Sequence, residues 1–281
     1  MQPADPEPLP EGWTDGTVES NGIEIRYTRT NDGTTTKPPF VICHGVFDDG
    51  PCRTPLAREL AEEYDVVLVD ARGHGRSDAP AEGYAMADRV ADLVGVIEAL
   101  DLEDPILFGH SMGGDTVAAT AAAHPELPRA VVMEDPAGML AHEESREEMA
   151  AWASDRIEFW HGHSKAELLE ADDEISGYVA DGRAELARHL ADARLRVSPH
   201  ISAVFTNGWV DTAETYPGIR VPTLILKADG DDAERERTIE QAAHLPDGEL
   251  VHVEGTGHTV FRDDRTVATR ELRAFLDGLE E

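Results

Sequence analysis

The sequence predicts an α/β fold: a mostly parallel, twisted sheet with helices on both faces. Short apolar runs rich in β-branched residues alternate with segments whose apolar residues recur every three or four positions, which is the alternation of strands and amphipathic helices. The chain has 281 residues, 41% of them hydrophobic, so it is long enough to bury the core that such a sheet requires.

The predicted sheet begins with a hairpin and continues with six short strands. Residues 16–30 alternate on either side of Asn21-Gly22, a dipeptide typical of tight hairpin turns. The later runs are short and rich in β-branched and other apolar residues, as in strands buried on both faces. They span residues 40–43, 65–70, 105–109, 130–135, 222–229 and 249–255.

Helices are predicted between these strands, at 54–64, 86–100 and 114–125, and after the last strand at 266–279. The alternation stops once, between residues 137 and 218, where three helical patterns follow one another without a strand. They lie at 145–163, 165–175 and 183–197.

We interpret this stretch as a helical insertion. The predicted core therefore comprises residues 1–136 and 219–281, and residues 137–218 form a cap or lid. Within the core, the proline-rich residues 1–12 are expected to be a loose arm.

The charge balance is strongly acidic. The chain carries 24 Lys+Arg against 57 Asp+Glu, a formal net charge of −33, and only three of the cations are lysines. Such a surface repels nucleic acid and anionic membranes, so neither is expected as a partner. The acidic side chains also repel one another, and concentrated salt weakens that repulsion by shortening the Debye length to about 3 Å at 1 M. The charge balance therefore favours a halophilic source; an ordinary acidic protein is the alternative.

The sequence contains no run of 18 apolar residues, and its acidic, proline-rich start does not resemble a signal peptide. We therefore expect a cytoplasmic protein without a membrane partner, either a monomer or a homodimer. Two cysteines, Cys43 and Cys52, are too few for a metal site or a disulfide framework, so they are expected to be buried structural thiols and no metal is expected.

Ser111 is the candidate nucleophile. It lies in Gly-His-Ser-Met-Gly, directly after the apolar run 105–109 and before a predicted helix. The glycines at 109 and 113 would allow a strained turn that exposes Oγ. The amide of Met112, at the start of the helix, could stabilise a developing oxyanion, and Val46, after the first long strand, could supply a second amide.

A serine needs a general base, and His258 is the candidate. It follows the last predicted strand through a glycine-bracketed loop, at the edge of the sheet where Ser111 also falls. We expect the side chains of His44 and His110 to be structural.

The acid that orients the base is predicted among four carboxylates. Asp231 is preferred, because a position a few residues past the strand 222–229 could turn back toward His258. Asp135, at the end of the run 130–135, is the alternative, and Asp229 and Asp232 remain further candidates.

Together these motifs resemble the α/β-hydrolase fold family over nearly the whole chain outside the arm. The resemblance implies a nucleophilic Ser111 with oxyanion amides at Val46 and Met112. It places the acid at Asp231 in most members and at the position of Asp135 in some. Residues 70–78, DARGHGRSD, resemble a structural loop of the family, and residues 137–218 its cap.

The cap contributes aromatic residues that could line a substrate pocket: Trp152, Phe159, Trp160, Phe205 and Trp209. Packing of the cap onto the core is the alternative explanation for each of them.

The predicted function is hydrolysis of a small or medium carboxylic ester by a Ser-His-Asp triad, without a cofactor. A serine at position 111, where epoxide- and halide-displacing relatives carry aspartate, disfavours those reactions. Hydrolysis of a C–C bond, lactone, amide or thioester, or cofactor-free perhydrolysis, remains open. The alternative from another class is a ligand-sensing protein with a slow or inert triad.

Overall fold

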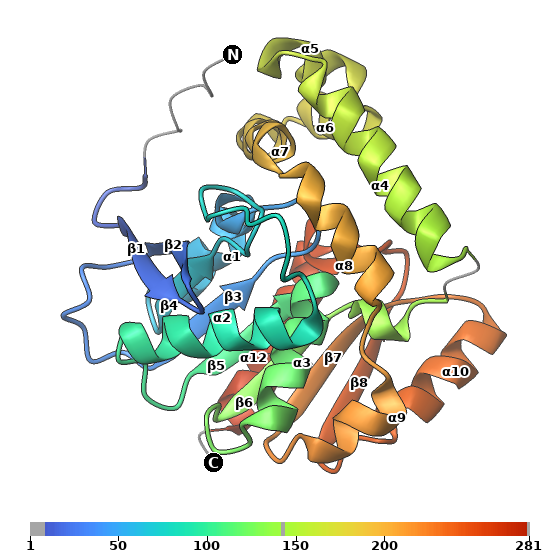
Figure 1. The fold of residues 1–281 in the computed structure, drawn as a ribbon. Helices are drawn as coiled ribbons and strands as arrows, with labels where there is room; N and C mark the ends of the chain where they lie inside the picture. The colour runs from blue at the N-terminus through green and yellow to red at the C-terminus, as the bar shows by residue number, and fades with distance from the viewer. Residues whose placement is uncertain (1–8, 142–143, 280–281) are drawn as a thin grey trace.

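The computed structural model describes residues 9–141 and 144–279, and its centre is one eight-stranded sheet in the order β1-β2-β4-β3-β5-β6-β7-β8 (Figure 1). The predicted hairpin and all six predicted strands are present. Their bounds are β1 Thr14–Ser20, β2 Ile23–Arg29, β3 Pro39–Cys43, β4 Asp65–Val69, β5 Ile106–His110, β6 Ala130–Glu134, β7 Thr223–Ala228 and β8 Gly248–Val253.

Parallel pairing dominates the sheet, as predicted. Strands β1 and β2 form an antiparallel hairpin, and β2 pairs antiparallel with β4. The five remaining pairings, from β4 through β3, β5, β6 and β7 to β8, are parallel. The carboxyl ends of β3 to β8 therefore meet at one edge of the sheet, where ligands of open α/β sheets bind.

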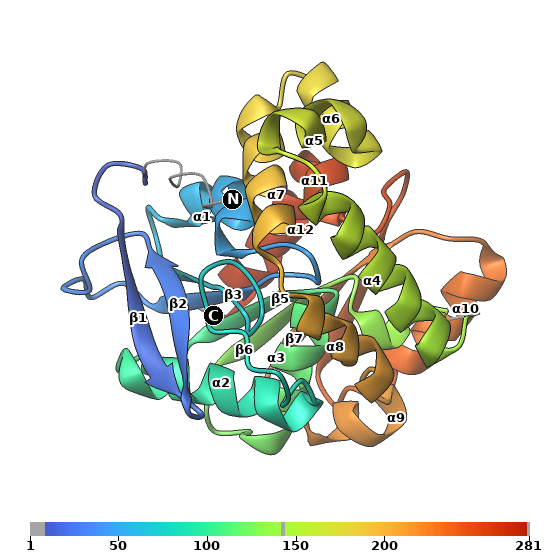
Figure 2. The ribbon, with the colours of Figure 1, turned by 45° about the horizontal axis from the view of Figure 1, so that its top comes forward.

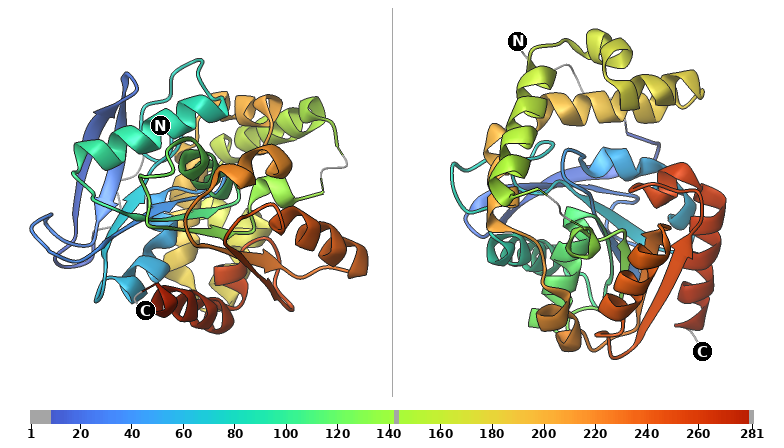
Figure 3. Two further views of the ribbon diagram at one scale, coloured as in Figure 1. Left: turned by 90° about the horizontal axis from the view of Figure 1, so that it is seen from below. Right: turned by 90° about the vertical axis from the view of Figure 1, so that its right-hand side faces the viewer.

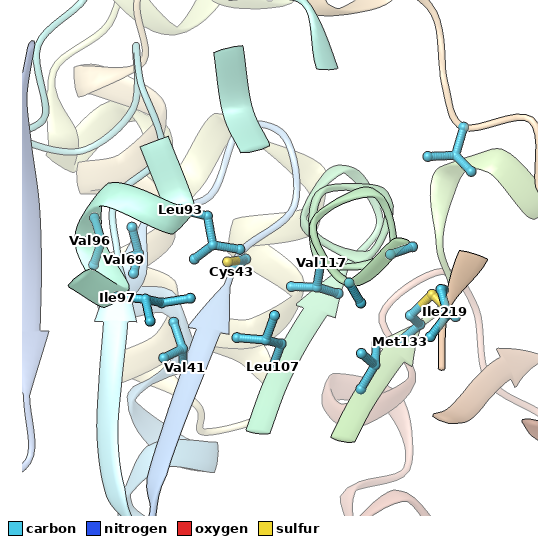
Figure 4. Close-up of a cluster of buried hydrophobic side chains, with 14 of the residues drawn as sticks. Val41, Cys43, Val69, Leu93, Val96, Ile97, Leu107, Val117, Met133 and Ile219 are labelled. Atoms are coloured by element: carbon cyan, nitrogen blue, oxygen red, sulfur yellow. The ribbon is translucent and has the colours of Figure 1, made fainter. Parts of the chain in front are cut away.

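Alternate residues of the central strands pack on opposite faces. In β3, Val41 and Cys43 pack toward α2 and α3, as Figure 4 shows, whereas Phe40 and Ile42 pack toward α1 and α12. Both faces are buried, which explains why these strands are apolar throughout. Cys43 and Cys52 are buried and form no disulfide.

Helices cover both faces, and Figure 3 shows the sheet between the two layers. The predicted core helices are all present; α10 and the short α11 are additional to them. The helices of the core are α1 Thr54–Leu60, α2 Met86–Ala99, α3 Met112–Ala123, α10 Asp232–Ala242, α11 Val260–Asp263 and α12 Arg265–Gly278.

In the described part of 137–218, between β6 and β7, the chain forms six further α-helices and no strand. Figure 2 shows α4 to α8 gathered on one side of the core, so this segment has the form of a cap. The bounds are α4 Arg146–His161, α5 Lys165–Ala171, α6 Asp173–Ala180, α7 Ala184–Arg196, α8 Ser202–Asn207 and α9 Thr212–Thr215.

The pattern predicted at 165–175 divides into α5 and α6 at Asp172, whose carboxylate caps α6 by accepting from the Ile175 amide at 3.2 Å. Most of the predicted N-terminal arm, residues 1–8, lies outside the described residues. Across 9–141 and 144–279, no helix has the length and apolar character needed to cross a membrane.

Candidate active site

Ser111 occupies a strained turn between β5 and α3. Its φ of 52° and ψ of −115° lie outside the usual regions for a residue with a side chain. The turn forms because its flanking glycines lack side chains. A Cβ on Gly109 would lie 2.1 Å from the Gly113 carbonyl oxygen, and a Cβ on Gly113 would lie 2.3 Å from that of Cys43. The geometry is that of a nucleophile elbow.

His258 reaches Ser111 from the loop after β8. Its Nε2 lies 2.8 Å from Ser111 Oγ, within hydrogen-bond distance. The structure therefore brings together the predicted nucleophile and the predicted base, although they are far apart in sequence.

The carboxylate that contacts His258 belongs to Asp135. Its Oδ2 lies 2.5 Å from Nδ1 of His258. The register of the sheet explains this contact: His110 pairs with Glu134 across β5 and β6, so Ser111 and Asp135 follow paired residues at the end of neighbouring strands. Asp135 has a φ of 42°, and its amide donates to the Leu226 carbonyl at 2.8 Å.

The preference for Asp231 is corrected by this arrangement. The chain after β7 does not turn back toward His258 but enters α10 at once. Asp231 is the N-cap of that helix and accepts from the Glu234 amide at 2.9 Å. Asp229 forms an ion pair with Arg235, and Asp232 is the first residue of α10.

Lys227 is the second partner of the Asp135 carboxylate, and sequence reasoning missed it. Its Nζ lies 2.5 Å from Oδ1, and both side chains are 1% exposed. Burial acts to raise the pKa of Asp135, but the hydrogen bond to His258 and the charge of Lys227 outweigh it and lower that pKa. A lysine in an otherwise apolar strand was the signal in the sequence, because a buried cation needs a buried anion.

Two buried residues hold the loop that carries His258. His110 Nε2 lies 2.8 Å from the His258 carbonyl oxygen, to which it can donate. Glu134 accepts from the Phe261 amide at 2.8 Å and from Arg53 Nη1 at 2.6 Å. Burial lowers the pKa of His110, which favours its neutral form. This contact with the His258 carbonyl supports the structural role expected of the His110 side chain, which stays a prediction.

The loop after β3 lies against Ser111. A Cβ on Gly45 would be 3.4 Å from that of Ser111, and Val46 lines the adjoining cavity. Met112 is the first residue of α3, so its amide has no acceptor within the helix. His44 supports the loop from behind, where its Nε2 accepts from the Ala71 amide at 3.0 Å. An oxyanion role for the Val46 and Met112 amides stays a prediction.

A cavity of about 690 Å³ opens above Ser111 and His258, between the core and the cap. Trp152, Trp160, Phe205 and Trp209 all line it, as the pocket prediction requires, although their contact with a substrate is untested. Phe159 is not among the lining residues; its ring centroid lies 4.4 Å from that of His163.

Other lining residues were not foreseen from the sequence, among them Phe47, Arg194 and Arg262. Phe47, with a φ of 71°, places its ring centroid 4.9 Å from that of Trp160. Arg194 of α7 and Arg262 of α11 bring positive charge to the cavity wall. No local pattern marks these residues, because core and cap meet only in the folded chain.

The hydrogen-bonded series Ser111, His258 and Asp135 has a defined chemical capacity. An imidazole that is fixed by a carboxylate at Nδ1 presents Nε2 as an acceptor for the serine proton. The hydroxyl can then attack an electrophilic carbon in the cavity.

Comparison with known proteins identifies the family of the chain. A family model described as the alpha/beta hydrolase family matches residues 40–271. The chain is 27% identical over 256 residues to a 2-(acetamidomethylene)succinate hydrolase of Mesorhizobium japonicum, covering 86% of this chain and 88% of the relative.

Two solved structures are similar in fold. An enol-lactonase from Burkholderia xenovorans has a TM-score of 0.77 at 22% identity and covers 93% of this chain and 100% of its own. An esterase from Rhodococcus has a TM-score of 0.71 at 23% identity and covers 95% and 99%. Because the family model spans most of the sequence, the chain belongs to the alpha/beta hydrolase family.

Proposed function

We propose that this protein is a serine hydrolase that cleaves a small or medium carboxylic ester, with Ser111 as nucleophile, His258 as general base and Asp135 as the orienting acid. The observation that carries the proposal is the continuous series of hydrogen-bond contacts from Ser111 Oγ through the imidazole of His258 to the carboxylate of Asp135. Asp135 takes the role that sequence reasoning preferred for Asp231.

The mechanism follows from these contacts. His258 Nε2 accepts the proton of Ser111 as Oγ attacks the carbonyl carbon, and Asp135 stabilises the imidazolium that forms. The amides of Val46 and Met112 would receive the negative charge that develops on the carbonyl oxygen. The imidazolium then protonates the leaving alcohol, and water releases the acyl group by the reverse sequence.

The relatives support acyl chemistry without fixing the bond that is cleaved. They include an esterase, an enol-lactonase and a hydrolase of 2-(acetamidomethylene)succinate. The cavity, at about 690 Å³, is of the size that small-molecule sites have, which supports a small or medium substrate.

A fluorophosphonate probe and an ester series test this proposal together. We expect covalent labelling of Ser111 and turnover of short and medium acyl esters, both abolished by Ser111→Ala. Thr120→Ser, a hydroxyl substitution on the buried side of α3, is the control and should keep both activities. Near wild-type turnover by Ser111→Ala would refute the assignment, and folded protein without labelling or turnover would favour a ligand-sensing role.

A further inference from the structure

The wall of the active-site cavity carries two buried arginines that the proposed ester chemistry does not use. Arg194 comes from α7 of the cap and Arg262 from α11 of the core, four residues after His258. They are only 6% and 7% exposed. A buried guanidinium is costly unless anions accompany it, so the identity of its partners shows what this part of the cavity is built to hold.

A carboxylate from the cap lies between the two arginines. Glu174 Oε2 is 2.6 Å from Nη2 of Arg194, and Oε1 is 3.7 Å from Nη1 of Arg262. Glu174 belongs to the first turn of α6, and its side chain is 41% exposed. The two cations are therefore fixed in the interior, whereas the anion between them comes from the surface and lines the same cavity.

The remaining contacts leave donors of both guanidiniums unused. Arg262 Nη2 lies 2.5 Å from the buried Asp48, and Arg194 Nη1 is 4.0 Å from Asp172. In the described residues, Nε of each arginine is buried without a hydrogen-bond acceptor, so an anion that enters the cavity would bind through the Nη atoms that Glu174 contacts. A guanidinium has five N–H donors in a planar fork that matches a carboxylate, so the pair can bind an anion that competes with Glu174.

The acidity of the whole chain makes this placement informative. The chain has 57 acidic side chains and only 24 Lys and Arg side chains. Two of these few cations, Arg194 and Arg262, are nevertheless buried at the cavity beside Ser111 and His258. Concentrated salt weakens attraction between exposed charges but screens a buried pair much less. A buried anion site of this kind would still bind its ligand in the concentrated salt that the acidic composition favours.

We propose that the substrate carries a carboxylate a few carbons from its scissile carbonyl, and that this carboxylate replaces Glu174 between Arg194 and Arg262. The inference rests on the proposed hydrolase function and names its substrate class. Glu174 then acts as an internal competitor that occupies the site in the absence of substrate.

Esters of matched shape provide the test, because an isopropyl group has the same number of heavy atoms as a carboxylate and no charge. Monoethyl succinate is compared with ethyl 4-methylpentanoate, and monoethyl glutarate with ethyl 5-methylhexanoate, by proton release in 2 M KCl. We expect kcat/KM of the anionic ester to exceed that of its neutral partner by about tenfold or more, as one charge-assisted hydrogen-bond pair provides.

Variants separate recognition from cap stability. Arg194→Met should lower the anionic-to-neutral ratio of kcat/KM by about tenfold. Glu174→Gln, which weakens the competitor, should raise that ratio. Glu185→Gln on α7 is the control: it removes an exposed ion-pair partner of Arg58 and should leave kcat/KM unchanged for both the anionic and the neutral ester. Arg194→Lys serves if Arg194→Met does not fold, and should lower the ratio because an ammonium cannot bind in a fork.

Equal kcat/KM for the matched esters in the wild type would overturn the inference while leaving the hydrolase proposal intact. A loss in Arg194→Met that is the same for both esters would also overturn it, since a purely structural contact between cap and core predicts that result. Absence of turnover of every ester, with no labelling of Ser111, would overturn both proposals.

Discussion

The same substitution at two aspartates, Asp135→Asn and Asp231→Asn, discriminates sharply between the two candidate acids. In the structure, Asp135 Oδ2 lies 2.5 Å from His258 Nδ1. An asparagine amide that donates to Nδ1 would force the proton onto Nε2, which then points at Ser111 and cannot accept its proton. We expect kcat to fall by about 10⁴, the effect of this change in Ser-His-Asp enzymes, which corresponds to about 5.4 kcal/mol of transition-state stabilisation.

Asp135→Asn also leaves Lys227 without its buried carboxylate. Removing one partner of a buried ion pair costs about 3–5 kcal/mol of stability, so the stability of this variant must be measured together with its activity. Asp135→Asn/Lys227→Met removes both charges and should recover stability without recovering activity. Urea unfolding separates the two effects from ester kinetics.

Asp231→Asn is the matched control. Asparagine caps a helix about as well as aspartate, so this variant should keep both its stability and its kcat. A loss of activity in Asp231→Asn that equals or exceeds the loss in Asp135→Asn would refute the assignment of the acid.

Three further outcomes are expected. Gly109→Ala should abolish labelling of Ser111 and lower the melting temperature, because its Cβ would lie 2.1 Å from the Gly113 carbonyl oxygen. Gly177→Ala is the control and should keep labelling, because a Cβ there would have no atom within 4 Å. A folded, active Gly109→Ala would contradict the strained turn. Burial raises the pKa of Asp115 to about 6, so its contribution to stability is full below pH about 4 and is lost as the pH rises to about 6. The free energy of unfolding, measured with urea from pH 4 to 8, should show this decline in the wild type and not in Asp115→Asn. The same decline in both proteins would argue against the role of Asp115. The melting temperature should rise between 0.1 and 2 M KCl as salt screens the net charge of −33, and full stability at 0.1 M would count against adaptation to salt.

Much of the architecture could be predicted from the sequence because it depends on local periodicity. The apolar runs of β3 to β7 reflect burial on both faces, and the three- and four-residue spacing of apolar residues indicates the helices. The turn at Ser111 was predictable for the same reason: the glycines that make it sterically possible are its own neighbours.

The acid was not decided by local pattern. Asp135 and Asp231 both follow strands, and their sequence contexts do not show which side chain turns inward. That choice depends on the register of β5 against β6 and on the abrupt start of α10, which are properties of the assembled sheet.

The residues that line the cavity also include some that the sequence predicted and some that it did not. Aromatic residues of the cap were predictable as a group, since a covering segment needs apolar side chains. The meeting of Arg194, Arg262 and Glu174 was not, because these residues come from separate helices of cap and core. The sequence alone determined the strands, most of the longer helices and the turn that exposes Ser111, because short-range sterics and burial periodicity specify them. Only the tertiary structure decided which charges face one another, because electrostatic partners are set by distance in space and not by separation along the chain.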